Sequence, residues 1–210
     1  MRTKLLALPA VAVLLAGCAT MHQAAGSIGL TPVNSVTLHQ DMRRLWADHV
    51  NWTRGYIIAA TSGSQSAPVV LNRLMRNQED IGNAIKPFYG DAAGAKLTDL
   101  LKQHIAIAGE LVAAAKAGDA TKQADADRRW HDNAADIASF LANANPKNWT
   151  RDGLLEMLNN HLALTTREAV DRLKMNWTDD VPNFDNIFTQ AMQMADALAD
   201  GIVKQFPTKA

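Results

Sequence analysis

The chain has 210 residues, of which 48% are hydrophobic, and it carries 21 basic and 21 acidic side chains. A chain of this length can form one domain with a sizeable core. The balanced charge, without a basic stripe, argues against nucleic acid as a partner.

The first 17 residues are predicted to be a signal peptide. Arg2 and Lys4 make its start positive, and an apolar run from Leu5 to Leu15 follows, too short to span a bilayer as a mature helix. The run ends in Leu15-Ala16-Gly17-Cys18, which resembles the cleavage site of bacterial lipoproteins. The resemblance implies that Cys18 becomes the first mature residue and carries the lipid.

Cys18 is the only cysteine, so no disulfide can form within one chain. The next residue is Ala19 and not aspartate, which resembles lipoproteins of the outer membrane. The expected location is therefore the periplasmic face of the outer membrane, with the membrane as a partner through the lipid. Residues 18–34 are predicted to be a tether, and residues 35–206 the domain.

Six helical segments are predicted in the domain, because no run of Val, Ile and Thr alternates for long enough to indicate a strand. Breaks are expected at Ser62–Ser64, Pro87–Asp91, Gly118, Asn145-Pro146 and Asn176–Pro182. Pro68 and Thr150 suit the starts of the second and fifth helices. We therefore predict an all-α antiparallel bundle, with its last helix running from about Asn183 to Gln205.

One short pattern occurs three times, each time with a histidine inside an apolar run. His49, His104 and His161 are 55 and 57 residues apart. A second pattern, Arg-x-x-x-Asn-x-x-Asp-Ile, follows the first two histidines, at Arg73–Ile81 and Arg129–Ile137. After the third histidine only part of it is kept, at Thr189–Ala197. Such a period predicts three degenerate helix hairpins.

Each hairpin is expected to place its histidine beside an aspartate. Residues equidistant from the turn of an antiparallel hairpin lie level. The three turns fall midway between His49 and Asp80, His104 and Asp136, and His161 and Asp196. The histidines then lie at similar heights on parallel helices. They meet if the hairpins close around an axis, and they stand roughly 10 Å apart if the hairpins stack in a row.

These residues have three interpretations. In the first, the His–Asp pairs are structural, because an unpaired buried polar group costs about 1–3 kcal/mol. In the second, the histidines bind a divalent transition metal, with the aspartates as ligands or orienting partners and Glu110 and Glu168 as further carboxylates. Against this, no helix carries the His-x-x-x-His or Glu-x-x-His spacing of a two-ligand clamp.

In the third interpretation, aromatic, arginine and amide side chains line a pocket for a small ligand. The candidates are Trp52, Tyr56, Arg73, Asn77, Arg129 and Asn133. The alternative for these residues is that the aromatics are core and the arginines pair with nearby acids. The sequence has no nucleophile motif and no phosphate-binding glycine loop, so it gives no support for an enzyme.

The stretch Leu45-Trp46-x-x-His49-Val50-x-Trp52-Thr53-Arg54, with Arg76-Asn77 and Pro87-Phe88-Tyr89-Gly90 downstream, resembles a group of small uncharacterised bacterial helical proteins. The resemblance covers about residues 36–206 and implies a helical fold without an assigned activity. We therefore predict an outer-membrane lipoprotein whose bundle binds a metal ion or small ligand through core His and Asp residues. The alternative is a structural or interaction lipoprotein whose His–Asp pairs only stabilise the bundle.

Overall fold

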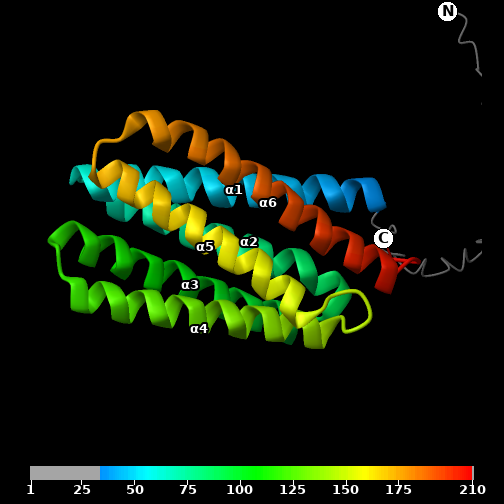
Figure 1. Ribbon diagram of the computed structural model, residues 1–210. Helices are drawn as coiled ribbons and strands as arrows, with labels where there is room; N and C mark the ends of the chain where they lie inside the picture. The colour runs from blue at the N-terminus through cyan, green and yellow to red at the C-terminus, as the bar shows by residue number, and fades with distance from the viewer. Residues whose placement is uncertain (1–33, 210) are drawn as a thin grey trace, which may run out of the picture. The chain divides into compact units, whose positions relative to one another are not determined.

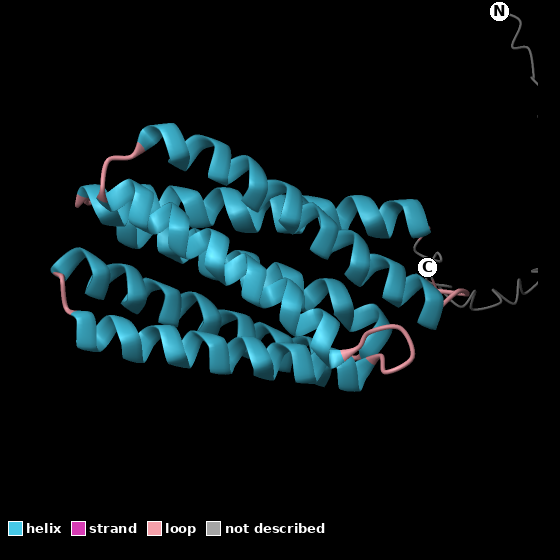
Figure 2. Ribbon diagram, viewed as in Figure 1, coloured by secondary structure: helices cyan, strands magenta, loops and turns pink. Residues whose placement is uncertain are grey.

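The computed structural model describes residues 34–209. The predicted signal peptide, Cys18 and nearly all of the tether lie outside the described residues. Every regular element in the described part is a helix, which confirms the all-α prediction (Figures 1 and 2). The helices are α1 (Ser35–Ser62), α2 (Ala67–Tyr89), α3 (Asp91–Ala117), α4 (Ala120–Ala144), α5 (Arg151–Leu173) and α6 (Trp177–Gln205).

Local side-chain and backbone chemistry explains several helix ends. Asn34, Asp119 and Thr150 each accept a hydrogen bond from a backbone N–H of the first turn of α1, α4 and α5. Gly63 and Gly118 end α1 and α3 with φ of 74° and 69°, the left-handed conformation that glycine adopts most easily. The predicted roles of Thr150 and Gly118 are therefore confirmed.

Two prolines that were expected to break the chain lie inside helices. α2 continues through Pro87 to Tyr89, and α6 begins at Trp177, ahead of Pro182. The predicted start of the last helix at Asn183 is therefore wrong. Each proline lies within two turns of a helix end, where the chain gives up one helical hydrogen bond without cutting the helix at its centre.

The three hairpins α1–α2, α3–α4 and α5–α6 close around a common axis. Each helix packs against the next one in the chain, and α6 packs against α1. α1, α3 and α5 also contact one another, so they form the inner part of the bundle. In Figure 1, α1 and α6 lie side by side although they come from opposite ends of the domain. This closed arrangement is the one in which the three histidines can meet.

The core repeats three times around the axis. Counted from each histidine, equivalent buried residues of α1, α3 and α5 come three positions before it and eight positions after it. They are Trp46, Leu101 and Leu158 in the first layer, and Ile57, Val112 and Ala169 in the second. Within residues 34–209, no helix is long and apolar enough to cross a membrane.

Candidate functional site

Three histidines meet at the centre of the bundle. His49 of α1, His104 of α3 and His161 of α5 are each at most 4% exposed. The ring centre of His161 lies 5.6 Å from that of His49 and 6.5 Å from that of His104. The prediction that these side chains lie at similar depth on parallel helices is confirmed.

The histidine of the second hairpin is held by an amide from α4. Asn133 Nδ2 donates to the carbonyl oxygen of Leu100, 3.1 Å away and one helical turn before His104. This bond orients the amide, so that Asn133 Oδ1 faces His104 Nδ1 at 2.8 Å. Because Oδ1 can only accept, His104 Nδ1 must carry the hydrogen. The neutral ring then keeps an unshared electron pair on Nε2.

The other two hairpins contain the same kind of hydrogen bond, from a side-chain amide of the outer helix to a backbone carbonyl of the inner helix. We call this contact the amide bridge. Asn77 Nδ2 donates to Leu45 at 3.0 Å, and Gln190 Nε2 donates to Met157 at 3.0 Å. Both carbonyl groups belong to residues four positions before a histidine, as Leu100 does. An amide from each outer helix therefore binds the equivalent carbonyl of its inner helix in all three hairpins.

The rings beside these two amides are less completely paired. Gln78 Nε2 lies 3.3 Å from His49 Nδ1. His161 Nδ1 and Gln190 Oε1 are both enclosed without a hydrogen-bond partner. Among the three core histidines, only His104 therefore has its ring hydrogen placed by a short, well-oriented contact.

Burial keeps all three rings uncharged. It lowers the pKa of His104 to about 3 and that of His161 to about 4. Burial, followed by the neighbouring histidines, also lowers the pKa of His49 well below its ordinary value. At neutral pH the cluster therefore consists of three neutral imidazoles.

The expected pairing of each histidine with an aspartate is wrong. Asp80 and Asp136 are exposed, and Asp196 pairs with Arg43, whose Nε lies 2.6 Å from Asp196 Oδ1. The physical reason is that the position beside each ring must donate to a backbone carbonyl, which a carboxylate cannot do. A buried carboxylate without a cation would also be costly.

The third copy of the repeat was placed three residues too late. The sequence pattern aligned Gln193 with the asparagines, but Gln190 makes the amide bridge. Gln190 follows His161 by 29 residues, as Asn133 follows His104 by 29. That equal separation is the sequence signal that identifies Gln190.

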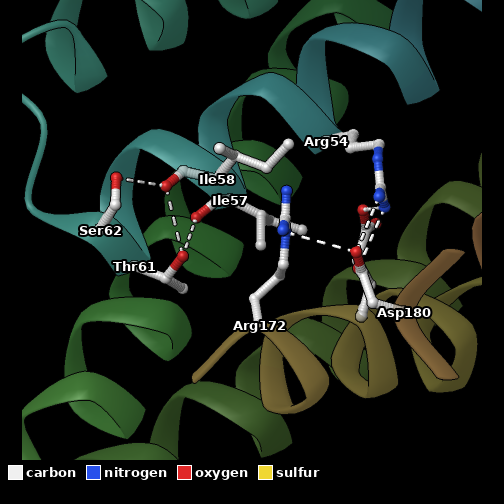
Figure 3. Close-up of polar contacts among 8 residues, drawn as sticks. Arg54, Ile57, Ile58, Thr61, Ser62, Arg172 and Asp180 are labelled. Carbon is white, nitrogen blue, oxygen red and sulfur yellow. Dashed lines mark hydrogen bonds and ion pairs between the residues drawn. The ribbon is translucent and has the colours of Figure 1, made fainter. Parts of the chain in front are cut away.

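Glu168, which was expected to add a carboxylate to the histidines, belongs to a separate buried ion cluster two turns further along α5. Arg54 Nη1 donates to Glu168 Oε1 at 2.5 Å. The two Nη atoms of Arg54 also donate to both oxygens of Asp180, at 3.1 and 2.8 Å (Figure 3). Both carboxylates are 1% exposed. Burial raises the pKa of Glu168 to about 7, although Arg54 opposes this shift.

The residues expected to line a ligand pocket are not gathered in one place. Glu110, the other expected carboxylate, lies on the surface and pairs with Arg129, which also binds Asp125. Asn77 and Asn133 are the core amides.

Arg73 of α2 lies over the ring of Trp52 of α1, 5.1 Å from its centre. Arg73 also pairs with Asp48. Tyr56 lines a small apolar cavity. These contacts are packing and surface pairing, so the predicted aromatic and arginine pocket does not form as one site.

Two apolar cavities flank the histidines along the axis. One of about 40 Å³ is lined by the residues three and seven positions before each histidine, among others. The other, about 30 Å³, is lined by the residues four and eight positions after each histidine. A water molecule needs roughly 10–15 Å³ in this measure, so each space has room for a few waters and not for an organic ligand.

As the side chains lie, residues 34–209 contain no group of three or more His, Cys, Asp or Glu residues arranged to hold a metal ion. Comparisons with protein-family models, with curated proteins and with solved structures found no match. The role of the cluster is therefore argued from its own chemistry, and the family resemblance stays a prediction.

Proposed function

We propose that the protein is a lipoprotein held at the periplasmic face of the outer membrane by Cys18, and that its bundle is a non-catalytic binding scaffold. The stretch Leu15-Ala16-Gly17-Cys18 supports the anchor. In this proposal the histidines stabilise the scaffold, and ligands or partners bind at its surface.

The observation that carries the structural role is the amide bridge that occurs in all three hairpins. Each bridge binds a buried carbonyl of an inner helix to a side-chain amide of its outer helix. A shift in the register of the two helices would leave the buried amide N–H without its acceptor. A buried polar group without its partner costs about 1–3 kcal/mol. Three such bridges at one level therefore select a single register for the bundle, and the histidine rings fill the same layer.

A metal ion bound by the three histidines is the second candidate, and the convergence of the rings favours it. Neutral imidazoles are common ligands of transition metals, and an acceptor for the other ring N–H, which Asn133 supplies to His104, orients such a ligand. The rings would have to turn so that three nitrogen atoms point at one place. The aspartates and glutamates named from the sequence take no part in this candidate site.

Stability measurements on His49→Gln, His104→Gln and His161→Gln separate the two candidates. In the structural role each substitution lowers the free energy of unfolding by about 1–3 kcal/mol, and a chelator changes nothing. The rings lie close together, so the double variants need not be additive. His131→Gln, at an exposed site on α4, is the matched control and is expected to be neutral.

In the metal role the unfolding temperature of the unaltered protein rises with zinc or copper concentration and falls with chelator. The three core variants lose this response, and His131→Gln keeps it. A chelator effect on the unaltered protein, or a stoichiometric metal in the purified protein, would overturn the structural role.

A further inference from the structure

A groove opens at the end of the bundle where α1 and α5 finish and α6 begins. Its volume is about 430 Å³, within the roughly 300–1,000 Å³ of small-molecule sites. Three apolar side chains stand exposed along it: Ile58 is 37% exposed, Met175 71% and Trp177 51%. Neighbouring large apolar side chains on a surface commonly mark an interaction site.

Arg172 is the only charged residue that lines this groove. Its side chain is 16% exposed and makes no hydrogen bond with any of residues 34–209; its Nε lies 3.5 Å from Asp180 Oδ2. The two other arginines of similarly low exposure, Arg54 and Arg73, both donate hydrogen bonds to carboxylates. Figure 3 shows Arg172 extending from α5 towards Ile57 of α1. A guanidinium in this position lacks oxygen acceptors, which a ligand can supply.

The surroundings leave positive charge at the floor of the groove. Asp180 is already bound by both Nη atoms of Arg54, so it only partly offsets Arg172. Glu168, the other carboxylate of the cluster, is only partly ionised at neutral pH because its pKa is raised to about 7. The two positive charges of Arg54 and Arg172 are therefore not fully balanced by the carboxylates of Asp180 and Glu168.

The two hydroxyl groups that line the groove both use their hydrogen within α1. Thr61 Oγ1 donates to the carbonyl oxygen of Ile57 and Ser62 Oγ to that of Ile58, each at 2.7 Å (Figure 3). Arg172 is therefore the charged donor that the groove offers to an anion. The Trp177 ring lies 5.0 Å from its guanidinium, so the charged and apolar surfaces adjoin.

We propose that the groove binds an amphipathic oxyanion, that is, a carboxylate or phosphate attached to an apolar body. The oxyanion accepts hydrogen bonds from the Nη atoms of Arg172, and the apolar body lies along Ile58, Met175 and Trp177. A guanidinium suits both kinds of oxyanion, because its donors match two oxygens at once. The proposal deepens the binding role of the scaffold and depends neither on the anchor nor on the histidines.

Calorimetric titration of the full chain carrying Cys18→Ser, which keeps the solution free of detergent, tests the proposal. The probes are decanoate, decyl phosphate, 1-decanol and acetate, each below its micelle concentration. At least one of the two decyl oxyanions is expected to bind at least tenfold more tightly than decanol or acetate, because only these carry both charge and apolar body. The tighter of the two identifies the ligand class as carboxylate or phosphate.

Two variants with matched controls locate the binding. Arg172→Gln and Trp177→Ala are each expected to weaken oxyanion binding about tenfold or more. Arg128→Gln and Val69→Ala, at exposed sites elsewhere, are expected to leave it unchanged. Because Trp177 is half exposed, its variant stays folded and keeps the test valid even if Arg172→Gln disturbs the ion cluster. The proposal would be overturned if neither decyl oxyanion bound more tightly than decanol, or if both groove variants bound the oxyanion as the unaltered protein does.

Discussion

At the scale of single residues, the chemistry of the histidine layer depends on the difference between an amide and a carboxylate. Asn133 both donates to Leu100 and accepts from His104, and an aspartate in its place could only accept. The amide also carries no charge into a layer that has apolar cavities on both sides. This explains why Asp136, one turn further along α4, is turned to solvent while Asn133 is buried.

The depressed pKa values of the histidines predict that the protein loses stability in mild acid. In the unfolded chain each histidine titrates near 6.5, whereas in the fold the pKa of His104 is about 3 and that of His161 about 4. Between these pKa values the unfolded state binds protons that the folded state does not bind. The contribution of the neutral histidines to the free energy of unfolding is therefore complete above pH 6.5 and is lost as pH falls. At pH 5 the expected loss is about 2 kcal/mol for each of His104 and His161.

Glu168 acts in the opposite direction. Burial raises its pKa from the ordinary 4.5 to about 7, so its charge destabilises the fold as pH rises. Acidification to pH 5 therefore restores about 2 kcal/mol of stability. His104 and His161 together outweigh this single carboxyl group, and the lowered pKa of His49 acts in the same direction as theirs. Urea unfolding between pH 7 and pH 5 measures the balance: His104→Gln is expected to flatten the dependence and Glu168→Gln to steepen it. Constant stability over this range would contradict the prediction.

At the scale of elements, the contact between α2 and α3 depends on two glycines. A Cβ atom on Gly82 would lie 2.0 Å from Thr98 Oγ1 and 2.6 Å from the carbonyl oxygen of Gly94. A Cβ atom on Gly94 would lie 2.7 Å from the carbonyl oxygen of Gly82. The two backbones therefore approach each other more closely than any residue with a side chain permits.

Gly82→Ala is accordingly expected to lower the free energy of unfolding by about 1–3 kcal/mol, because the new methyl group forces the helices apart. Gly55→Ala is the matched control within α1. Its Cβ atom would meet only Val70 Cγ1 at 3.5 Å, an ordinary contact. It is expected to raise stability by up to about 1 kcal/mol, through the helix propensity of alanine. Thermal unfolding of both variants checks the pair, and a stabilised Gly82→Ala protein would show that α2 and α3 adjust freely.

At the scale of the whole molecule, the histidine spacing and the turn positions were enough to predict three hairpins with parallel inner helices. They could not predict whether the hairpins close or stack, because closure depends on α6 meeting α1. The surface contacts between those helices include Arg43 with Asp196 and His39 with Asp200. Such pairs join residues more than 150 positions apart, and no local pattern in the sequence identifies them.

The candidate sites were predictable to different degrees. The histidines could be named because each interrupts an apolar run, which is conspicuous in sequence. Their partners were misassigned because Asn and Asp both recur in the repeat, and only the fold shows which of them faces the ring. The groove at Arg172 was missed altogether. It is assembled from the ends of α1 and α5 and the start of α6, where the repeat no longer constrains the sequence.

The anchor is the remaining prediction at this scale, and it concerns residues outside the described bundle. If Cys18 carries the lipid, Cys18→Ser abolishes labelling by a fatty-acid analogue and moves the protein from the membrane fraction to the soluble fraction. The unfolding temperature of the bundle is expected to stay the same, because residues 34–209 contain their own core. Ala19→Asp serves as the companion variant: it keeps the lipid and is expected to shift the protein to the inner membrane. Membrane association that survives Cys18→Ser would mean that something other than this cysteine holds the protein there.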